Sequence, residues 1–68
     1  MTNYRPMLEF GPNERQGNAQ VFETRTEALG SARDRFRHWT QPTGFGADET
    51  GDDVNYRWTE TEGDVSLT

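Results

Sequence analysis

The stretch TRTEALGSARDRFRHW, from Thr24 to Trp39, decides the fold predicted for this chain of 68 residues. Thr24 and Glu27 stand three positions apart, which is the spacing of a capping box at the start of a helix. The apolar residues that follow recur at spacings of three, four and three and form one stripe: Leu29, Ala32, Phe36 and Trp39. We therefore predict a helix from about Arg25 to Trp39 that packs its apolar stripe, with Phe36, on a sheet.

The end of this predicted helix is basic. Its last turns carry four residues that interact favourably with the negative end of the helix dipole: Arg33, Arg35, Arg37 and His38. Gln41 and Pro42 follow, and proline stops a helix. Together with Arg25, these arginines predict a basic helix face in a protein that also carries an acidic turn.

Two strands are predicted before the helix. In TNYRPMLEF, residues 2–10, apolar and polar residues alternate as they do in a half-buried strand. Pro6 cannot donate a ladder hydrogen bond, so we expect this strand at the edge of the sheet, or beginning near Met7. GPNERQGN, residues 11–18, is typical of a long hairpin loop. It leads into a second predicted strand within AQVFET, residues 19–24.

Further strands are predicted after the helix. TGFGADET, residues 43–50, predicts a short third strand that its two glycines weaken. VNYRWTE, residues 54–60, places alternate apolar residues on one face and is the clearest strand of the second half. Val65 and Leu67 also alternate, which allows a last short pairing.

These segments predict the α+β class, with a small antiparallel sheet in the order β-β-α-β-β and one helix packed on one face. We expect a single domain over residues 1–60 and an acidic, flexible C-terminal tail over residues 61–68. Aliphatic residues are few, but the eight aromatic residues can each bury about 150–250 Å² and so form a core. A domain this small has little room for an internal active site, which favours binding over catalysis.

Cysteine is absent from the sequence, so the fold relies on no disulfide and no thiolate metal site. The segment MTNYRPMLEF lacks the basic region and apolar run of an export signal. No segment approaches the roughly 18 consecutive apolar residues of a membrane-spanning helix. We therefore expect a soluble protein of the cytoplasm.

Negative charge is concentrated in the second half of the sequence. Residues 1–40 carry six arginines and five carboxylates, whereas residues 41–68 carry one arginine and seven carboxylates: Asp48, Glu49, Asp52, Asp53, Glu60, Glu62 and Asp64. Such a group would imitate a polyanion, because its potential steers toward a basic groove and excludes nucleic acid. We predict that these seven residues bind a partner. The alternative is a solvated acidic turn and tail that keep the domain soluble.

Neither a catalytic site, a cofactor nor a metal site is predicted. DETGDD, residues 48–53, does not match the spacing of a calcium loop, and one histidine without cysteine leaves few ligands for zinc. His38 stands four residues after Asp34, but such helical pairs are usually surface features. The helix arginines could contact phosphates beside Tyr56 and Trp58, yet the acidic net charge and the absence of lysine disfavour direct binding of nucleic acid.

Two stretches, TRTEALGSARDRFRHW and DDVNYRW, carry a family resemblance. With the preceding strand and hairpin, from about Tyr4 to Trp58, the chain resembles small uncharacterised proteins encoded by bacteriophages and prophages, a group that includes anti-CRISPR proteins. The resemblance implies a protein in the host bacterial cytoplasm that blocks the basic nucleic-acid site of a CRISPR effector subunit. The alternative is a non-catalytic accessory or regulatory protein that homodimerises through its sheet edge, with the acids serving only solubility.

Overall fold

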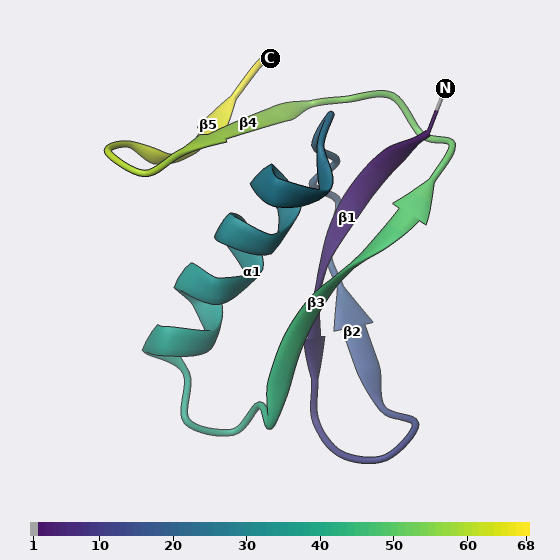
Figure 1. Cartoon of the computed structure of the whole chain (residues 1–68), viewed down its shortest axis with the longest axis vertical. Helices are drawn as coiled ribbons and strands as arrows, with labels where there is room; N and C mark the ends of the chain where they lie inside the picture. The colour runs from purple at the N-terminus through teal and green to yellow at the C-terminus, as the bar shows by residue number, and fades with distance from the viewer. Residues whose placement is uncertain (1) are drawn as a thin grey trace.

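The computed structural model of the chain describes residues 2–68, shown in Figure 1. This part of the chain forms one helix and five strands: β1 (Asn3–Glu9), β2 (Arg15–Gly17), α1 (Arg25–His38), β3 (Gly44–Thr50), β4 (Tyr56–Thr59) and β5 (Gly63–Ser66). The predicted α+β class, with one helix and antiparallel strands, is confirmed. The strands divide between two sheets, a three-stranded one in the order β2-β1-β3 and a two-stranded one of β4 and β5.

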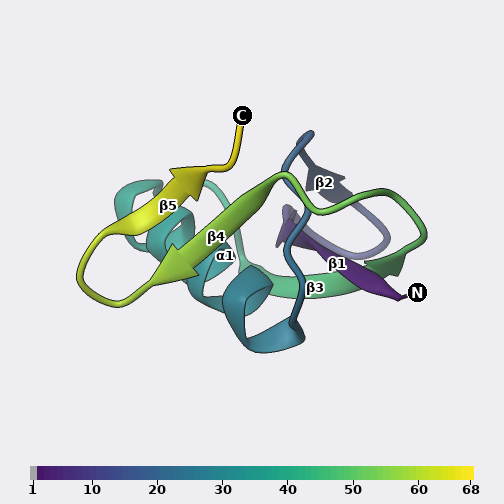
Figure 2. The same cartoon turned by 90° about the horizontal axis from the view of Figure 1, so that it is seen from above.

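The helix lies between the two sheets. α1 packs against β1 and β3 on one side, and the β4–β5 hairpin crosses another side of it, as the view from above shows (Figure 2). The hairpin therefore covers helix residues that a fold with one sheet would leave exposed. Within residues 2–68, the helix is neither long enough nor apolar enough to cross a membrane.

The predicted helix is confirmed, with bounds of Arg25–His38. Thr24 is the N-cap: its hydroxyl oxygen accepts a hydrogen bond from the backbone N–H of Glu27 at 3.2 Å. This bond satisfies one of the backbone donors that a helix start leaves free. At the other end, the backbone N–H of Trp39 donates to the carbonyl oxygen of Phe36, and Trp39 itself is already extended.

The buried face of the helix consists of small residues: Ala28, Gly30, Ser31 and Ala32. The large buried side chains come from β1 and from the segment before the helix: Pro6, Leu8, Val21 and Phe22. Because protein interiors are closely packed, a helix can approach a layer of large side chains only through small residues of its own. The core therefore depends on pairing large residues outside the helix with small residues on it.

The predicted apolar stripe of the helix is only partly correct. Ala32 is buried and Leu29 and Phe36 are half-buried, but Trp39 is 47% exposed. Phe36 does face the three-stranded sheet, since its ring centroid lies 5.3 Å from that of Phe45 on β3. The larger members of the stripe thus border the core rather than fill it.

The prediction that the first strand lies at an edge was wrong, because β1 is the central strand of its sheet. Tyr4 exchanges backbone hydrogen bonds with Phe22, at 2.9 and 2.8 Å, on the side of β1 away from β3. Backbone groups alternate along a strand, so the nitrogen of Pro6 faces that same side. β2 pairs with β1 only as far as Met7. Pro6 therefore lies between this pairing and the bridge of Tyr4 to Phe22, where no strand needs the N–H that proline lacks.

The second strand lies inside the segment that was predicted to be a loop. The turn closes early, because the N–H of Glu14 donates to the carbonyl of Gly11 at 3.2 Å and the N–H of Phe10 donates to that of Glu14 at 2.9 Å. Asn13 and Gly11 have φ angles of 65° and 134°, which suit asparagine and glycine. Residues 19–24, all within the described chain, contribute only the bridge of Phe22 to the sheet.

The third strand is stronger than its glycines indicated. All seven residues of β3 pair with β1, from Gly44 to Thr50. β4 begins at Tyr56 rather than Val54, and the residue between them, Asn55, bonds to the segment before the helix. Its side chain donates to the carbonyl of Ala19 and accepts from the N–H of Val21, each at 2.8 Å.

The last strand, β5, pairs antiparallel with β4 and contains Val65, one of the two apolar residues that allowed a last short pairing. Four residues of the predicted tail therefore belong to the second sheet. The division of the chain at residue 60 and the flexibility of residues 61–68 stay predictions.

Candidate binding surface

The seven carboxylates predicted to bind a partner lie in two groups on opposite sides of the molecule (Figure 1). One group lies at the end of β3 and in the loop after it: Asp48, Glu49, Asp52 and Asp53. The other lies in the β4–β5 turn and on β5: Glu60, Glu62 and Asp64. We call them the β3 acids and the hairpin acids.

Asp48, on β3, is held by an arginine two strands away. One terminal nitrogen of Arg15, on β2, lies 2.7 Å and 2.9 Å from the two carboxylate oxygens of Asp48. Arg15 also lies 3.5 Å from the carboxylate of Glu9, on β1. The three side chains cross one face of the sheet, so much of the charge of Asp48 is balanced within the molecule.

Two more β3 acids have arginine partners but remain exposed. Glu49 lies 3.6 Å from Arg25 of the helix, and Asp52 pairs with Arg5 of β1. The sheet brings the start of the helix beside β3, so Arg25 of the predicted basic helix face lies next to the β3 acids. The side chains of Glu49 and Asp52 are still 66% and 61% exposed. Such pairs contribute only about 0.2–1 kcal/mol each, so a partner could compete for these carboxylates.

Asp53 differs from its neighbours. It is exposed, and within residues 2–68 its carboxylate has neither an ion pair nor a side-chain hydrogen bond. The same holds, over the described residues, for the carboxylates of Glu60 and Glu62 in the β4–β5 turn. Among the seven predicted acids, these three have no arginine partner in the described chain, and the same is true of Glu14 and Glu23 outside that set.

The carboxylate of Asp64 is bound to other residues of the chain and is not free to contact a partner. Its carboxylate accepts a hydrogen bond from the side-chain amide of Gln20 at 2.9 Å and lies 3.5 Å from Arg35. Gln20 is buried, and its amide oxygen accepts in turn from Arg35. This polar junction ties β5 to the helix and to the segment before it.

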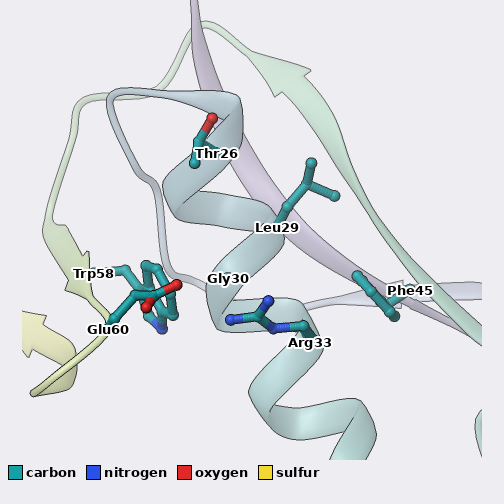
Figure 3. Close-up of a pocket in the computed structure, with 7 residues that line it drawn as sticks. All are labelled: Thr26, Leu29, Gly30, Arg33, Phe45, Trp58 and Glu60. Atoms are coloured by element: carbon teal, nitrogen blue, oxygen red, sulfur yellow. The ribbon is translucent and has the colours of Figure 1, made fainter.

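A groove between α1 and β4, open to solvent, has a volume of about 260 Å³ (Figure 3). Leu29 and Gly30 of the helix form its base, and Phe45 of β3 stands on one side. Trp58 and Glu60, from β4 and the turn after it, stand on the other side. No single stretch of the sequence indicates this groove, because its walls come from three separate elements.

Trp58 is fixed on the helix at three points. Its ring lies so close to Gly30 that a Cβ atom there would stand 2.6 Å from the ring carbons. Its indole N–H donates to the carboxylate of Asp34 at 2.8 Å, and its backbone N–H donates to that of Glu27 at 3.1 Å. Gly30 was the one available signal, since glycine inside a helix is unfavourable and often marks a close approach.

Arg33 also lines the groove, and its guanidinium carbon lies 5.8 Å from the ring centroid of Trp58. Its Nε atom is buried and has no hydrogen-bond partner among residues 2–68. Arginine side chains only donate, so this atom lacks an acceptor. In the sequence, Arg33 is one of several helix arginines, and nothing in the pattern distinguishes it.

The described residues contain no group of three or more histidine, aspartate or glutamate side chains placed to hold a metal ion. Comparisons of the chain with protein-family models, with curated proteins and with solved structures found no match. The function proposed below therefore depends on the geometry and charge of the chain, together with the resemblance noted above.

Proposed function

We propose that this chain is a non-catalytic inhibitor that binds a host protein at a basic nucleic-acid-binding surface. Its most concrete form is a phage-encoded anti-CRISPR protein that occupies the nucleic-acid site of a CRISPR effector subunit. The observation that supports this function best is that three of the seven predicted acids are exposed and have no internal partner among the described residues: Asp53, Glu60 and Glu62.

The mechanism is electrostatic and steric competition. Carboxylates on two sides of the molecule would face a basic channel at two points, where phosphates otherwise bind. The unpaired acids would make the first contacts, and Glu49 and Asp52 would exchange their weak internal pairs for those of the partner. Asp48 and Asp64 would contribute less, because Arg15 and Arg35 already balance them.

The test begins with capture of a partner from bacterial lysate on the immobilised chain. We expect a protein that binds nucleic acid, and we expect DNA or RNA to compete with the chain for it. The double variant Asp53→Asn/Glu62→Gln should bind that protein about tenfold more weakly, or ~1.4 kcal/mol, mainly through slower association. Raised salt should weaken the wild-type complex in the same way.

A matched control removes two exposed acids outside both groups, Glu14→Gln/Glu23→Gln. This control should bind like the wild type, since those charges lie elsewhere on the surface. Equal affinity of the two double variants, at low and high salt, would contradict the polyanion mechanism. So would simultaneous binding of nucleic acid and the chain to the captured protein.

The geometry also favours a second candidate, an accessory or regulatory protein that homodimerises through β3. Among the described strands, none pairs with the outer side of β3, and Phe45 on that strand is 37% exposed. Backbone groups of alternate residues face this edge, although the carbonyl of Ala47 already accepts a hydrogen bond from Arg25 at 3.2 Å. In that case the wild-type chain sediments as a dimer, and Asp53→Asn/Glu62→Gln reduces its solubility without affecting any complex.

A further inference from the structure

The outer side of β3 carries backbone groups that no described strand pairs with. Tyr4, on β1, exchanges its backbone hydrogen bonds with Phe22, on the side away from β3. Backbone groups alternate along a strand, so the neighbours of Tyr4 bond to β3, and the β3 residues opposite those neighbours bond back. The N–H and C=O groups of Phe45, Ala47 and Glu49 therefore point outward. All three residues are at least partly exposed, so a further strand can reach this edge.

This edge is complementary to itself in one antiparallel register. When Ala47 lies opposite Ala47 of a second copy, Phe45 lies opposite Glu49 of that copy, and all three outward-facing residues are paired. On the other face of the strand, Asp48 then lies opposite Gly46, so no two carboxylates are directly opposite each other. A shift of one copy by two residues toward Glu49 would instead place Asp48 opposite Asp48. The partner that fits this edge is therefore a second copy of the chain, in the register centred on Ala47.

Arg25, the first residue of α1, occupies the middle of this edge. One terminal nitrogen of its side chain donates to the carbonyl oxygen of Ala47 at 3.2 Å, and the other lies 3.6 Å from the carboxylate of Glu49. Its guanidinium carbon lies 4.9 Å from the ring centroid of Tyr4, which is a cation–π contact. These three contacts hold the guanidinium group where a further strand would have to place the N–H that bonds to Ala47.

In the self-paired arrangement, two copies of Arg25 would meet. A two-fold axis passes between the two Ala47 residues, and the Cα atoms of such a hydrogen-bonded pair lie about 5.5 Å apart. Each guanidinium group is bonded to its own Ala47, so both would lie beside this axis. Two like charges at such a short distance repel each other. Arg25 therefore opposes the very register that the backbone of the edge favours.

We infer that Arg25 prevents the chain from pairing with a second copy along β3, and that its removal allows a dimer in which Ala47 lies opposite Ala47. Charged side chains placed at an edge strand are one way in which proteins keep such edges from pairing. The inference does not rest on the proposed function. It bears on the second candidate function, because homodimerisation through β3 requires Arg25 to leave Ala47.

Sedimentation of the full chain over a range of concentrations tests the inference. Arg25→Ala removes the three contacts and the repulsion, so its dimer should have a dissociation constant about tenfold lower than that of any wild-type dimer. The matched control is Arg37→Ala, which removes the same charge from an exposed position on the same helix. This control should sediment like the wild type. Circular dichroism verifies that each variant is folded.

Cysteine substitution tests the register, because the chain has no cysteine of its own. Arg25→Ala/Ala47→Cys should form a disulfide-linked dimer under mild oxidation, since the expected Cα separation suits a disulfide. Arg25→Ala/Thr50→Cys should not, because Thr50 lies opposite Gly44 of the second copy in this register. Ala47→Cys with Arg25 in place should cross-link more slowly than the first double variant.

A monomeric Arg25→Ala variant would overturn the inference, and so would equal cross-linking at positions 47 and 50. A wild-type chain that dimerises through β3 as tightly as Arg25→Ala would also overturn it, and would favour the second candidate function. Asp53→Asn/Glu62→Gln leaves β3 unchanged, so it should sediment like the wild type while losing affinity for the captured partner. The failure of this inference and the failure of the polyanion mechanism are therefore distinguishable.

Discussion

At the scale of single residues, Gly30 holds the helix and the second sheet together. It allows the ring of Trp58 to lie against the helix backbone, while the bond from the indole to Asp34 fixes the ring's orientation. Helix propensity alone would disfavour glycine here by about 1 kcal/mol relative to alanine. Packing against Trp58 therefore explains the glycine at this position and outweighs its low helix propensity.

Gly30→Ala should destabilise the protein, by about 1–3 kcal/mol, although the same change in an exposed helix usually stabilises it. The added methyl group would stand 2.6 Å from three ring carbons of Trp58, and these cannot move without losing the bond to Asp34. Chemical denaturation followed by circular dichroism measures the effect. Gly51→Ala, where a Cβ has no neighbour within 4 Å, is the control and should change little. Greater stability of Gly30→Ala would contradict this packing.

At the scale of elements, local signals predicted the helix and failed for the sheet. The capping box of Thr24 and Glu27 and the apolar spacing act within a few residues, so the sequence reveals them directly. The position of β1 could not be predicted, because the effect of Pro6 depends on where β2 ends. β2 itself is exposed at all three residues and so carries no apolar pattern.

The candidate site also has features that local sequence reveals and features that depend on long-range contacts. Carboxylates were easy to find, but their ion pairs join residues that are far apart in the chain, as Arg15 and Asp48 are. Whether an acid is balanced or free therefore depends on the tertiary fold. The groove shows this most clearly, since no stretch of sequence contains more than one of its walls.

The large buried residues should dominate the stability of the elements. Phe22 is fully buried, whereas Phe36 is half-buried at the edge of the core. Phe22→Ala should cost about 3–5 kcal/mol, comparable with the whole stability of so small a domain, and should unfold it. Phe36→Ala serves as the comparison and should keep a cooperative, lower thermal transition. A larger loss for Phe36→Ala than for Phe22→Ala would contradict the core described above.

At the scale of the whole molecule, the two sheets are held to the helix in different ways. The three-stranded sheet shares the apolar core with α1, including Leu8 and Ala32. The β4–β5 hairpin is attached mainly through Trp58, Asn55 and Asp64. An isolated two-stranded hairpin is only marginally stable in water, so these attachments decide whether it stays in place.

We therefore expect the hairpin to open before the rest of the molecule. Native-state hydrogen exchange should show faster exchange for the amides of β4 and β5 than for those of β1 that pair with β3. Trp58→Phe, which removes the bond to Asp34, should accelerate exchange in the hairpin more than in β1. Uniform protection across both sheets would contradict separate opening, and would also argue against a flexible tail after residue 60.

The pairing of β1 with β3 also determines when the sheet can form during synthesis. Asn3 lies opposite Thr50, so β1 can pair with β3 only after all the residues between the two strands have been synthesised. Closing so long a loop carries an entropic cost that local contacts do not. The helix can form from its own residues while β1 is still unpaired, with Leu8 and Tyr4 exposed to solvent. During synthesis the sheet therefore forms later than the helix.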